Sequence, residues 1–190
     1  MPSKIRAFIA IELESKVKDK ISQIQNILQK TNADAKWVNP KNIHLTLKFL
    51  GYIDQEKSEK IKQVIDQTAE NFQSFSIETS QIGIFPQKGT PRVIWIGIKK
   101  GKETLEKITS KIEEKIEKLG IKKENRPFQS HATIARIRSP KNKQILLTEI
   151  KRINEAIDTE IQTISAIALF RSTLSPSGPT YSLIHKAKLQ

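Results

Sequence analysis

Hydrophobic positions along the chain follow two spacings, one typical of strands and one typical of helices. Residues 5–11 (IRAFIAI) predict a strand, and apolar residues at helical spacing predict a helix over 15–30. The HLTL segment that starts at residue 44 alternates like a strand, and Asp54 is suited to cap a helix that runs to about Phe72. Residues 74–85 alternate again. The first half therefore predicts the order strand, helix, strand, helix, strand.

The same order follows a turn-like segment at 86–91 (PQKGTP). Strands are expected at 92–98 (RVIWIGI) and 130–136 (SHATIAR), with a helical stripe over 105–119 between them. A helix from 140 to about 156 and a strand at 164–171 (ISAIALFR) complete the series, and a last strand is expected at 180–188. The chain is thus interpreted as one domain, 1–190, with an internal duplication of approximately 1–86 and 92–172 and a C-terminal strand within 178–190. Two unrelated runs of alternating helices and strands are the alternative.

This arrangement predicts the fold class. Two units that each bury one sheet face under helices would form a bilobal α+β protein with a cleft between its lobes. The first apolar stretch of the chain is short and flanked by charges, too brief for a signal sequence or a membrane span. With no cysteine, the chain also suits a reducing compartment, so a cytoplasmic protein that does not enter a membrane is expected.

The net charge of the chain indicates a class of binding partner. The 33 Lys and Arg residues against 20 Asp and Glu give a formal net charge of +13, which attracts polyanions, chiefly nucleic acid. The lysines are spread along helical segments and do not form one run, so a solvated lysine-rich surface is an equally good interpretation of the charge alone.

The candidate chemistry lies in a repeated pattern of histidine and threonine. The chain has three histidines, and two of them, His44 and His131, are each followed two residues later by a threonine, Thr46 and Thr133. Residues two apart on a strand point to the same face, about 6–7 Å apart, so each strand would present an imidazole and a hydroxyl together. The third histidine, His185, lacks the pattern and is expected to be structural or at the surface.

Two imidazoles and two hydroxyls suit an anionic substrate from which one proton is removed and to which another is given. Histidine serves as acid or base near neutral pH, and threonine hydroxyls donate hydrogen bonds to phosphate oxygens. No Asp or Glu stands at metal-ligand spacing around either motif, which argues against a two-metal nuclease, and no metal or cofactor is expected. The alternative is that each histidine only satisfies a local hydrogen bond in its strand.

The chain contains, in this order, the segments HLTLKFLG, TPRVIWIGI, RPF, SHATIAR and FRSTLSPSGPTYSLI. On these segments it resembles the two-histidine (2H) phosphoesterases over essentially its whole length. Within them it resembles the RNA 2′,3′-cyclic phosphodiesterases, also called 2′-5′ RNA ligases. The resemblance implies two pseudo-symmetric lobes with antiparallel sheets. It also implies metal-independent hydrolysis of RNA 2′,3′-cyclic phosphate ends, such as those of tRNA halves, to 2′-phosphates. Reversible 2′-5′ joining at the same site is implied too, and a monomer is expected.

The resemblance also implies roles for individual residues. His131 would be the base for the attacking water and His44 the acid for the leaving O3′, although the order of the two is left open. Phe49 would stack on a base and Arg136 would bind phosphate, five residues after the first and second histidine respectively. Ideal alternation places both on the face opposite the histidines, so each strand must twist, bulge or end there. The alternative for Phe49 is a core position.

The sequence leaves alternatives open for the roles of several other residues. Lys48 shares the His44 face in an ideal strand, so it could add charge at the cleft or simply be solvated. The two tryptophans, Trp37 and Trp95, are expected to be packing residues. The competing functions are a basic RNA-binding module without chemistry and hydrolysis of another cyclic or 2′-5′ phosphodiester. The sequence leaves open the native RNA and the direction of the reaction, and it assigns no role to three further landmark residues: Arg92, Arg126 and Tyr181.

Overall fold

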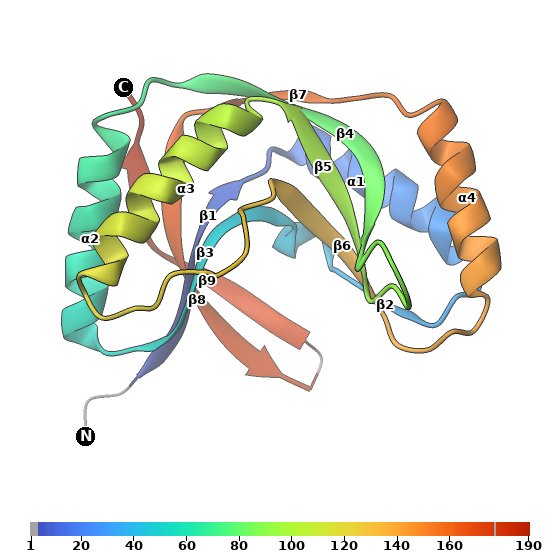
Figure 1. The fold of residues 1–190 in the computed structure, drawn as a ribbon, viewed down its shortest axis with the longest axis horizontal. Coiled ribbons are helices and arrows are strands. Elements are labelled where there is room, and N and C mark those ends of the chain that lie inside the picture. Colours follow the sequence, from blue (N-terminus) through green and yellow to red (C-terminus); the bar gives the residue numbers. More distant parts are fainter. Residues whose placement is uncertain (1–3, 177) are drawn as a thin grey trace.

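The computed structural model describes residues 4–176 and 178–190 as a two-lobed α+β protein with two antiparallel sheets (Figure 1). The strands are β1 (Ile5–Glu12), β2 (Ala35–Trp37), β3 (His44–Ile53), β4 (Phe75–Phe85), β5 (Val93–Lys100), β6 (His131–Ile137), β7 (Ile161–Ile164), β8 (Ala166–Ser175) and β9 (Gly178–Lys188). The helices are α1 (Ser15–Gln29), α2 (Gln55–Ala69), α3 (Lys102–Glu117) and α4 (Lys143–Glu155), with a 3₁₀ turn at Pro40–Asn42.

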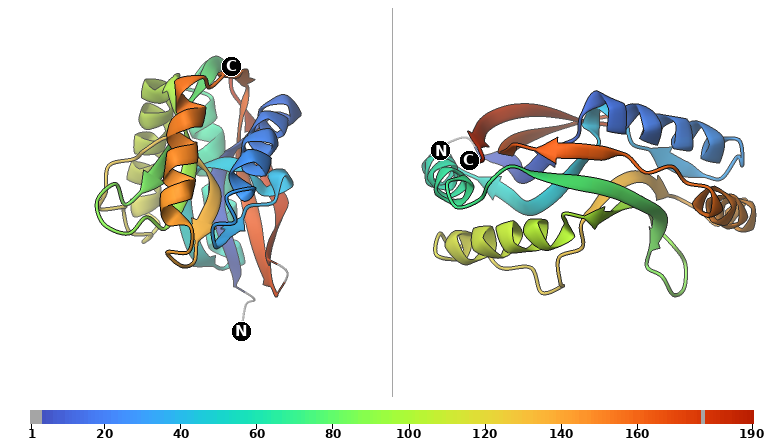
Figure 2. Two further views of the ribbon diagram at one scale, coloured as in Figure 1. Left: turned by 90° about the vertical axis from the view of Figure 1, so that its right-hand side faces the viewer. Right: turned by 90° about the horizontal axis from the view of Figure 1, so that it is seen from above.

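Each sheet lies in one lobe with two helices against it. One sheet has the strand order β3-β1-β8-β9, and the other has β2-β6-β5-β4-β7. Helices α2 and α3 lie together at one end of the molecule beside the four-stranded sheet, and α1 and α4 lie at the other end beside the five-stranded sheet (Figures 1 and 2). The bilobal α+β prediction is therefore confirmed.

The local signals in the sequence explain why these elements form. The Asp54 side chain accepts a hydrogen bond from the Lys57 amide at 2.9 Å, which caps α2 as predicted. The apolar stripe of α1 is buried, as are the stripes of α2 and α3. All eleven predicted elements are present within a few residues of their expected bounds. The short strands β2 and β7 were not predicted, because three or four residues carry too little pattern.

The two halves of the sequence do not correspond to the two sheets. Strands β8 and β9 from the second half join β1 and β3, whereas β4 from the first half pairs with β5 and β7. Helix α1 also crosses over, since the buried Gln25 amide donates to the Ile134 carbonyl of β6 at 2.8 Å. Each lobe is therefore built from both halves, and the internal duplication of 1–86 and 92–172 stays a prediction.

Candidate active site

The two motif histidines are the first residues of β3 and β6, and these two strands are in contact where the lobes meet. Each Nδ1 lies 2.7 Å from the backbone carbonyl oxygen two residues earlier, Asn42 for His44 and Gln129 for His131. A carbonyl oxygen only accepts, so each Nδ1 carries the hydrogen. The neutral rings therefore have their lone pair on Nε2, and both are held in the same tautomer.

The two threonines differ in their hydrogen bonding. The Thr46 hydroxyl lies 2.9 Å from Nε2 of His44, so in the neutral ring the hydroxyl donates to that nitrogen. Among the described residues, no hydrogen bond joins Thr133 to His131 or to any other side chain. Nε2 of His131 is thus without a protein partner within the described chain, whereas Nε2 of His44 has one.

Aromatic side chains from distant strands enclose His44. The ring of Phe8 on β1 stacks against the imidazole at 4.7 Å, and Tyr181 on β9 meets it edge-on at 5.3 Å. Phe8 also contacts Tyr181 and Phe170, so the rings form one cluster. Sequence reasoning assigned no role to Tyr181 and missed Phe8, because nothing in the apolar run of β1 indicates which residue will face a histidine on β3.

His131 has aromatic neighbours of its own. Phe85 meets the imidazole edge-on at 5.2 Å, and the Trp95 ring centroid lies 6.1 Å from it. A Cβ atom at Gly83 would overlap the Trp95 indole, so only glycine leaves room for that ring. Trp95 is a packing residue as predicted, and the histidine it packs beside belongs to the candidate site. Trp37 is partly buried against the core, also as predicted.

Burial is the main electrostatic influence on the site. It lowers the pKa of His44, opposed by the Asn42 hydrogen bond, while the positive charges of Lys18 and His131 lower that pKa further. Burial likewise lowers the pKa of His131, opposed by the Gln129 hydrogen bond and assisted by the Arg136 charge. The charge of His131 thus acts on the pKa of His44 across the contact between β3 and β6. Both pKa shifts favour neutral rings at neutral pH.

Matching bulges turn Phe49 and Arg136 toward the histidine faces. In β3, Ala10 pairs with Thr46 and Ile9 with Lys48, which leaves Leu47 as the extra residue. In β6, Trp95 pairs with Thr133 and Ile94 with Ala135, which leaves Ile134 extra. Each bulge follows its histidine by three residues and shifts the alternation by one position.

After the bulges, both side chains are exposed on the site side of their strands. Phe49 is 55% exposed and pairs with Phe8, whose ring lies 6.3 Å from its own. It is therefore not a core residue. Arg136 is exposed, and its charge lowers the pKa of both His131 and Tyr181, which come from different lobes. Burial outweighs this influence in Tyr181, whose pKa is raised. The bulges that the two roles required are confirmed, and the roles themselves stay predictions.

The same bulge corrects the placement of Lys48. In an ideal strand this lysine shares the His44 face, but here it is 2% exposed on the opposite side. Its Nζ lies 2.8 Å from the Glu113 carboxylate on α3 and 2.7 Å from the Lys122 carbonyl oxygen. Lys48 is neither solvated nor at the site. It is part of a buried ion pair that joins β3 to α3.

The structure also defines the surroundings of four other residues. His185 points to the helical side of its sheet and pairs with Asp66 of α2 at 2.7 Å, so its structural role is confirmed. Arg92 takes part in backbone hydrogen bonds with Phe85 and Ile137, and Arg126 is exposed in a loop. Ser130, which directly precedes His131, is buried.

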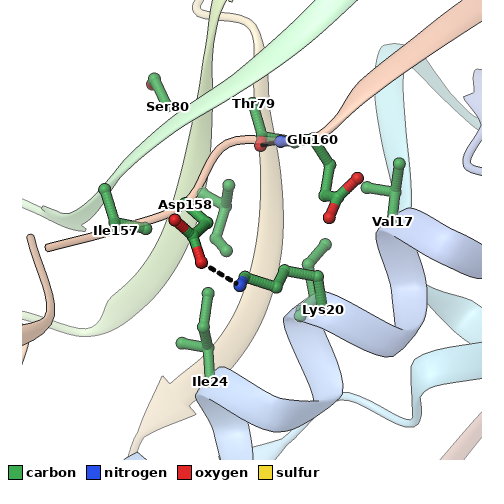
Figure 3. Close-up of a pocket in the computed structure, with 10 residues that line it drawn as sticks. Val17, Lys20, Ile24, Thr79, Ser80, Ile157, Asp158 and Glu160 are labelled. Carbon is green, nitrogen blue, oxygen red and sulfur yellow. Dashed lines mark hydrogen bonds and ion pairs between the residues drawn. The ribbon is translucent and has the colours of Figure 1, made fainter.

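A small cavity between α1 and the five-stranded sheet is separate from the site (Figure 3). It is lined by residues that include Val17, Ile24 and Thr79, and the Lys20–Asp158 ion pair at 3.1 Å lies beside it. Its volume of about 10 Å³ admits no more than a water-sized molecule. Among the described residues no helix is long and apolar enough to cross a membrane, and no three metal-ligating side chains come together.

Comparison of the whole chain with known proteins identifies its family. A model of the LigT-like phosphoesterases matches residues 11–95 and 96–181. The chain belongs to this family. It is 35% identical over 180 residues to an RNA 2′,3′-cyclic phosphodiesterase of Methanocaldococcus jannaschii, covering 95% of this chain and 98% of that one. Against the corresponding protein of Methanothermobacter thermautotrophicus, identity is 32% over 179 residues, covering 94% and 96%.

Solved structures agree with this family assignment. The crystal structure of TT0787 from Thermus thermophilus matches with a TM-score of 0.81 and 25% identity, covering 97% of this chain and 98% of that one. LigT of E. coli in its apo form matches with a TM-score of 0.77 at 21% identity, covering 98% of both chains. At that identity the second match supports the fold alone. The two-histidine resemblance of the sequence is therefore confirmed at the level of family and fold.

Proposed function

We propose that this protein is an RNA 2′,3′-cyclic phosphodiesterase that uses its two motif histidines as acid and base. The observation that carries the proposal is the pairing of two imidazoles, each held in one tautomer by a backbone carbonyl, close enough for one to lower the pKa of the other. Its relatives at up to 35% identity carry the same activity in their names. A site that only binds RNA has no need of two such oriented proton-transfer groups.

The reaction needs one proton removed and one supplied. The lone pair on Nε2 of His131 accepts a proton from water as the water oxygen bonds to phosphorus. The phosphorus–O3′ bond breaks, and Nε2 of His44 gives its proton to O3′, which leaves the phosphate on O2′. Low pKa values keep the rings neutral before substrate binds, and the negative charge of the bound phosphate then favours protonation of His44.

The neighbouring groups suit an anionic transition state. The Arg136 guanidinium is exposed beside His131 and is able to hold phosphate oxygens by two parallel hydrogen bonds. The hydroxyls of Thr46 and Thr133 would donate to the remaining oxygens. With the 5′-hydroxyl of a second RNA in place of water, the same groups would catalyse joining: the 5′-oxygen bonds to phosphorus, the phosphorus–O3′ bond breaks, and a 2′-5′ linkage forms. Independence from metal, a monomeric state, tRNA halves as substrates and a cytoplasmic location remain expectations.

The deciding experiment is incubation of the purified protein with a short RNA that ends in a 2′,3′-cyclic phosphate, in the presence of EDTA. We expect the 2′-phosphate and not the 3′-phosphate to form. A 3′-phosphate product would mean that O2′ leaves instead. Loss of activity in EDTA with recovery on addition of a divalent cation would indicate a metal enzyme. Tight binding without hydrolysis would favour the RNA-binding module.

A further inference from the structure

A second pocket opens on the four-stranded sheet, beyond the aromatic cluster around His44. Its volume is about 260 Å³, near the lower end of pockets that hold small molecules. Its lining residues come from the start of β1, the end of β3 and the second half of β8. Its lining includes Lys4, Arg6, Tyr52, Arg171, Ser172 and Leu174.

The strand register connects this pocket directly to the candidate active site. Two rows of residues cross the sheet side by side. The first row, nearer the imidazole, consists of Phe49, Phe8, Phe170 and Leu183. The second row consists of Tyr52, Arg6, Ser172 and Tyr181. Since Arg6 and Phe8 are two residues apart on β1, the rows are separated by about 6–7 Å on one face.

Contacts within the second row reach His44. The Arg6 guanidinium donates to the Ser172 hydroxyl at 3.1 Å, and its charge lowers the pKa of Tyr181 against the effect of burial. The Tyr181 ring lies 5.3 Å from the His44 ring. Ser172 pairs with Tyr181 across β8 and β9, so Arg6 is connected to the His44 ring through Ser172 and Tyr181.

The chemistry of the pocket fits one nucleotide of a single strand. Among residues 4–176 and 178–190, three cations line it, Lys4, Arg6 and Arg171, and no carboxylate does. None of the three has an ion-pair partner among the described residues, although Glu and Lys side chains pair at many other surface positions. Tyr52 is 67% exposed and offers a free aromatic face next to them. Unpaired cations beside an exposed ring are what single-stranded nucleic acid requires.

We propose that this pocket is a second nucleotide subsite, which binds the nucleotide preceding the one that carries the cyclic phosphate. The base stacks on Tyr52, and its phosphate lies against Arg6 and the neighbouring cations. The inference rests on the proposed function, since the subsite is defined relative to the cyclic phosphate that the enzyme hydrolyses. It predicts that the substrate is an RNA chain of two or more nucleotides and not a mononucleotide.

The test compares kcat/KM for adenosine 2′,3′-cyclic phosphate and for the dinucleotide ApA with the same cyclic end. For the parent protein we expect a preference for the dinucleotide of about ten-fold or more. Both Tyr52→Ala and Arg6→Gln should reduce this ratio several-fold. Lys111→Gln, which removes one charge from an exposed position of α3, is the matched control and should keep the ratio.

The outcomes separate the subsite from the proposed function. Hydrolysis of both substrates with equal kcat/KM would overturn the subsite and leave the function standing. A ratio that falls in Arg6→Gln but not in Tyr52→Ala would also overturn it, because the pocket would then bind phosphate alone. If the folded parent hydrolyses neither substrate, the function fails. Anisotropy of fluorescein-labelled ApApA then decides the subsite, with weaker binding by Tyr52→Ala supporting it and equal binding overturning it.

Discussion

The two histidine motifs are built alike and surrounded differently. Each imidazole donates from Nδ1 to a carbonyl at 2.7 Å, and each strand bulges three residues later. His44 is stacked on Phe8 and bonded to Thr46, whereas His131 meets its aromatic neighbours edge-on and has Arg136 beside it. The common parts fix the direction and tautomer of the rings. The clearest difference lies five residues after each histidine, where the first motif has the aromatic Phe49 and the second has the positively charged Arg136.

Removing either imidazole tests the proton-transfer group that both motifs have, and it should cause the largest loss of kcat. His44→Ala and His131→Ala should each lower kcat about 10³-fold, since each removes one of two proton-transfer groups. RNA binding should change little, because lysines supply most of the attraction. His185→Gln is the matched control, as that histidine pairs with Asp66 away from the site. Turnover near the parent rate in either alanine variant would refute the two-histidine mechanism.

Arg136→Gln tests the positive charge five residues after His131, at the position that matches Phe49 in the first motif. Loss of charge-assisted hydrogen bonds to phosphate should cost about 2 kcal/mol, or roughly 30-fold in kcat/KM. Arg136 lowers the pKa of His131, so its removal should raise that pKa. A base works when neutral, so the acidic limb of the pH–rate profile should move to higher pH. The control is Arg152→Gln, which breaks only the ion pair with Glu149 on α4 and should change neither kcat/KM nor the pH of the acidic limb. If the acidic limb of Arg136→Gln stays at the parent pH, the Arg136 charge does not act on the catalytic base.

Phe49→Leu tests the exposed ring five residues after His44, at the position that matches Arg136 in the second motif. Leucine keeps an apolar side chain but removes the ring, so binding of the terminal base should weaken by about 1 kcal/mol, or roughly five-fold in KM. Leu183→Ala on the same face of the sheet removes exposed apolar surface without an aromatic ring and serves as the comparison. If KM for a short RNA is equal in Phe49→Leu and the parent, the base does not stack there.

Replacing either threonine by valine should give the smallest effect. The quantity to measure is the pKa of each motif histidine, followed by NMR titration. The Thr46 hydroxyl donates to neutral His44, so Thr46→Val removes a bond that favours the neutral ring and should raise the pKa of His44. Thr133 makes no bond to His131 within the described residues, so Thr133→Val should leave the pKa of His131 unchanged. Equal responses of the two histidines would mean that the difference between the motifs is absent in solution.

Local patterns account for the features that could be predicted. Helix α2 was expected because a capping aspartate precedes an apolar stripe, and both interactions lie within a few residues of each other. The histidine–threonine pairs were found for the same reason, since two residues on one strand face are neighbours whatever the strand packs against. The position of Lys48 was wrong because ideal alternation was extended through a bulge, and a bulge depends on the partner strand.

The sequence by itself determined the order of elements, the two motifs, their family resemblance and the strong positive charge. Only the tertiary structure decided which strands share a sheet, so only it brought Phe8 and Tyr181 to His44 and Phe85 and Trp95 to His131. It also turned Phe49 and Arg136 toward the site and buried Lys48 against Glu113. The physical reason is that side-chain spacing acts over a few residues, whereas register, bulges and ring contacts depend on strands that are up to 170 or so positions apart in the chain.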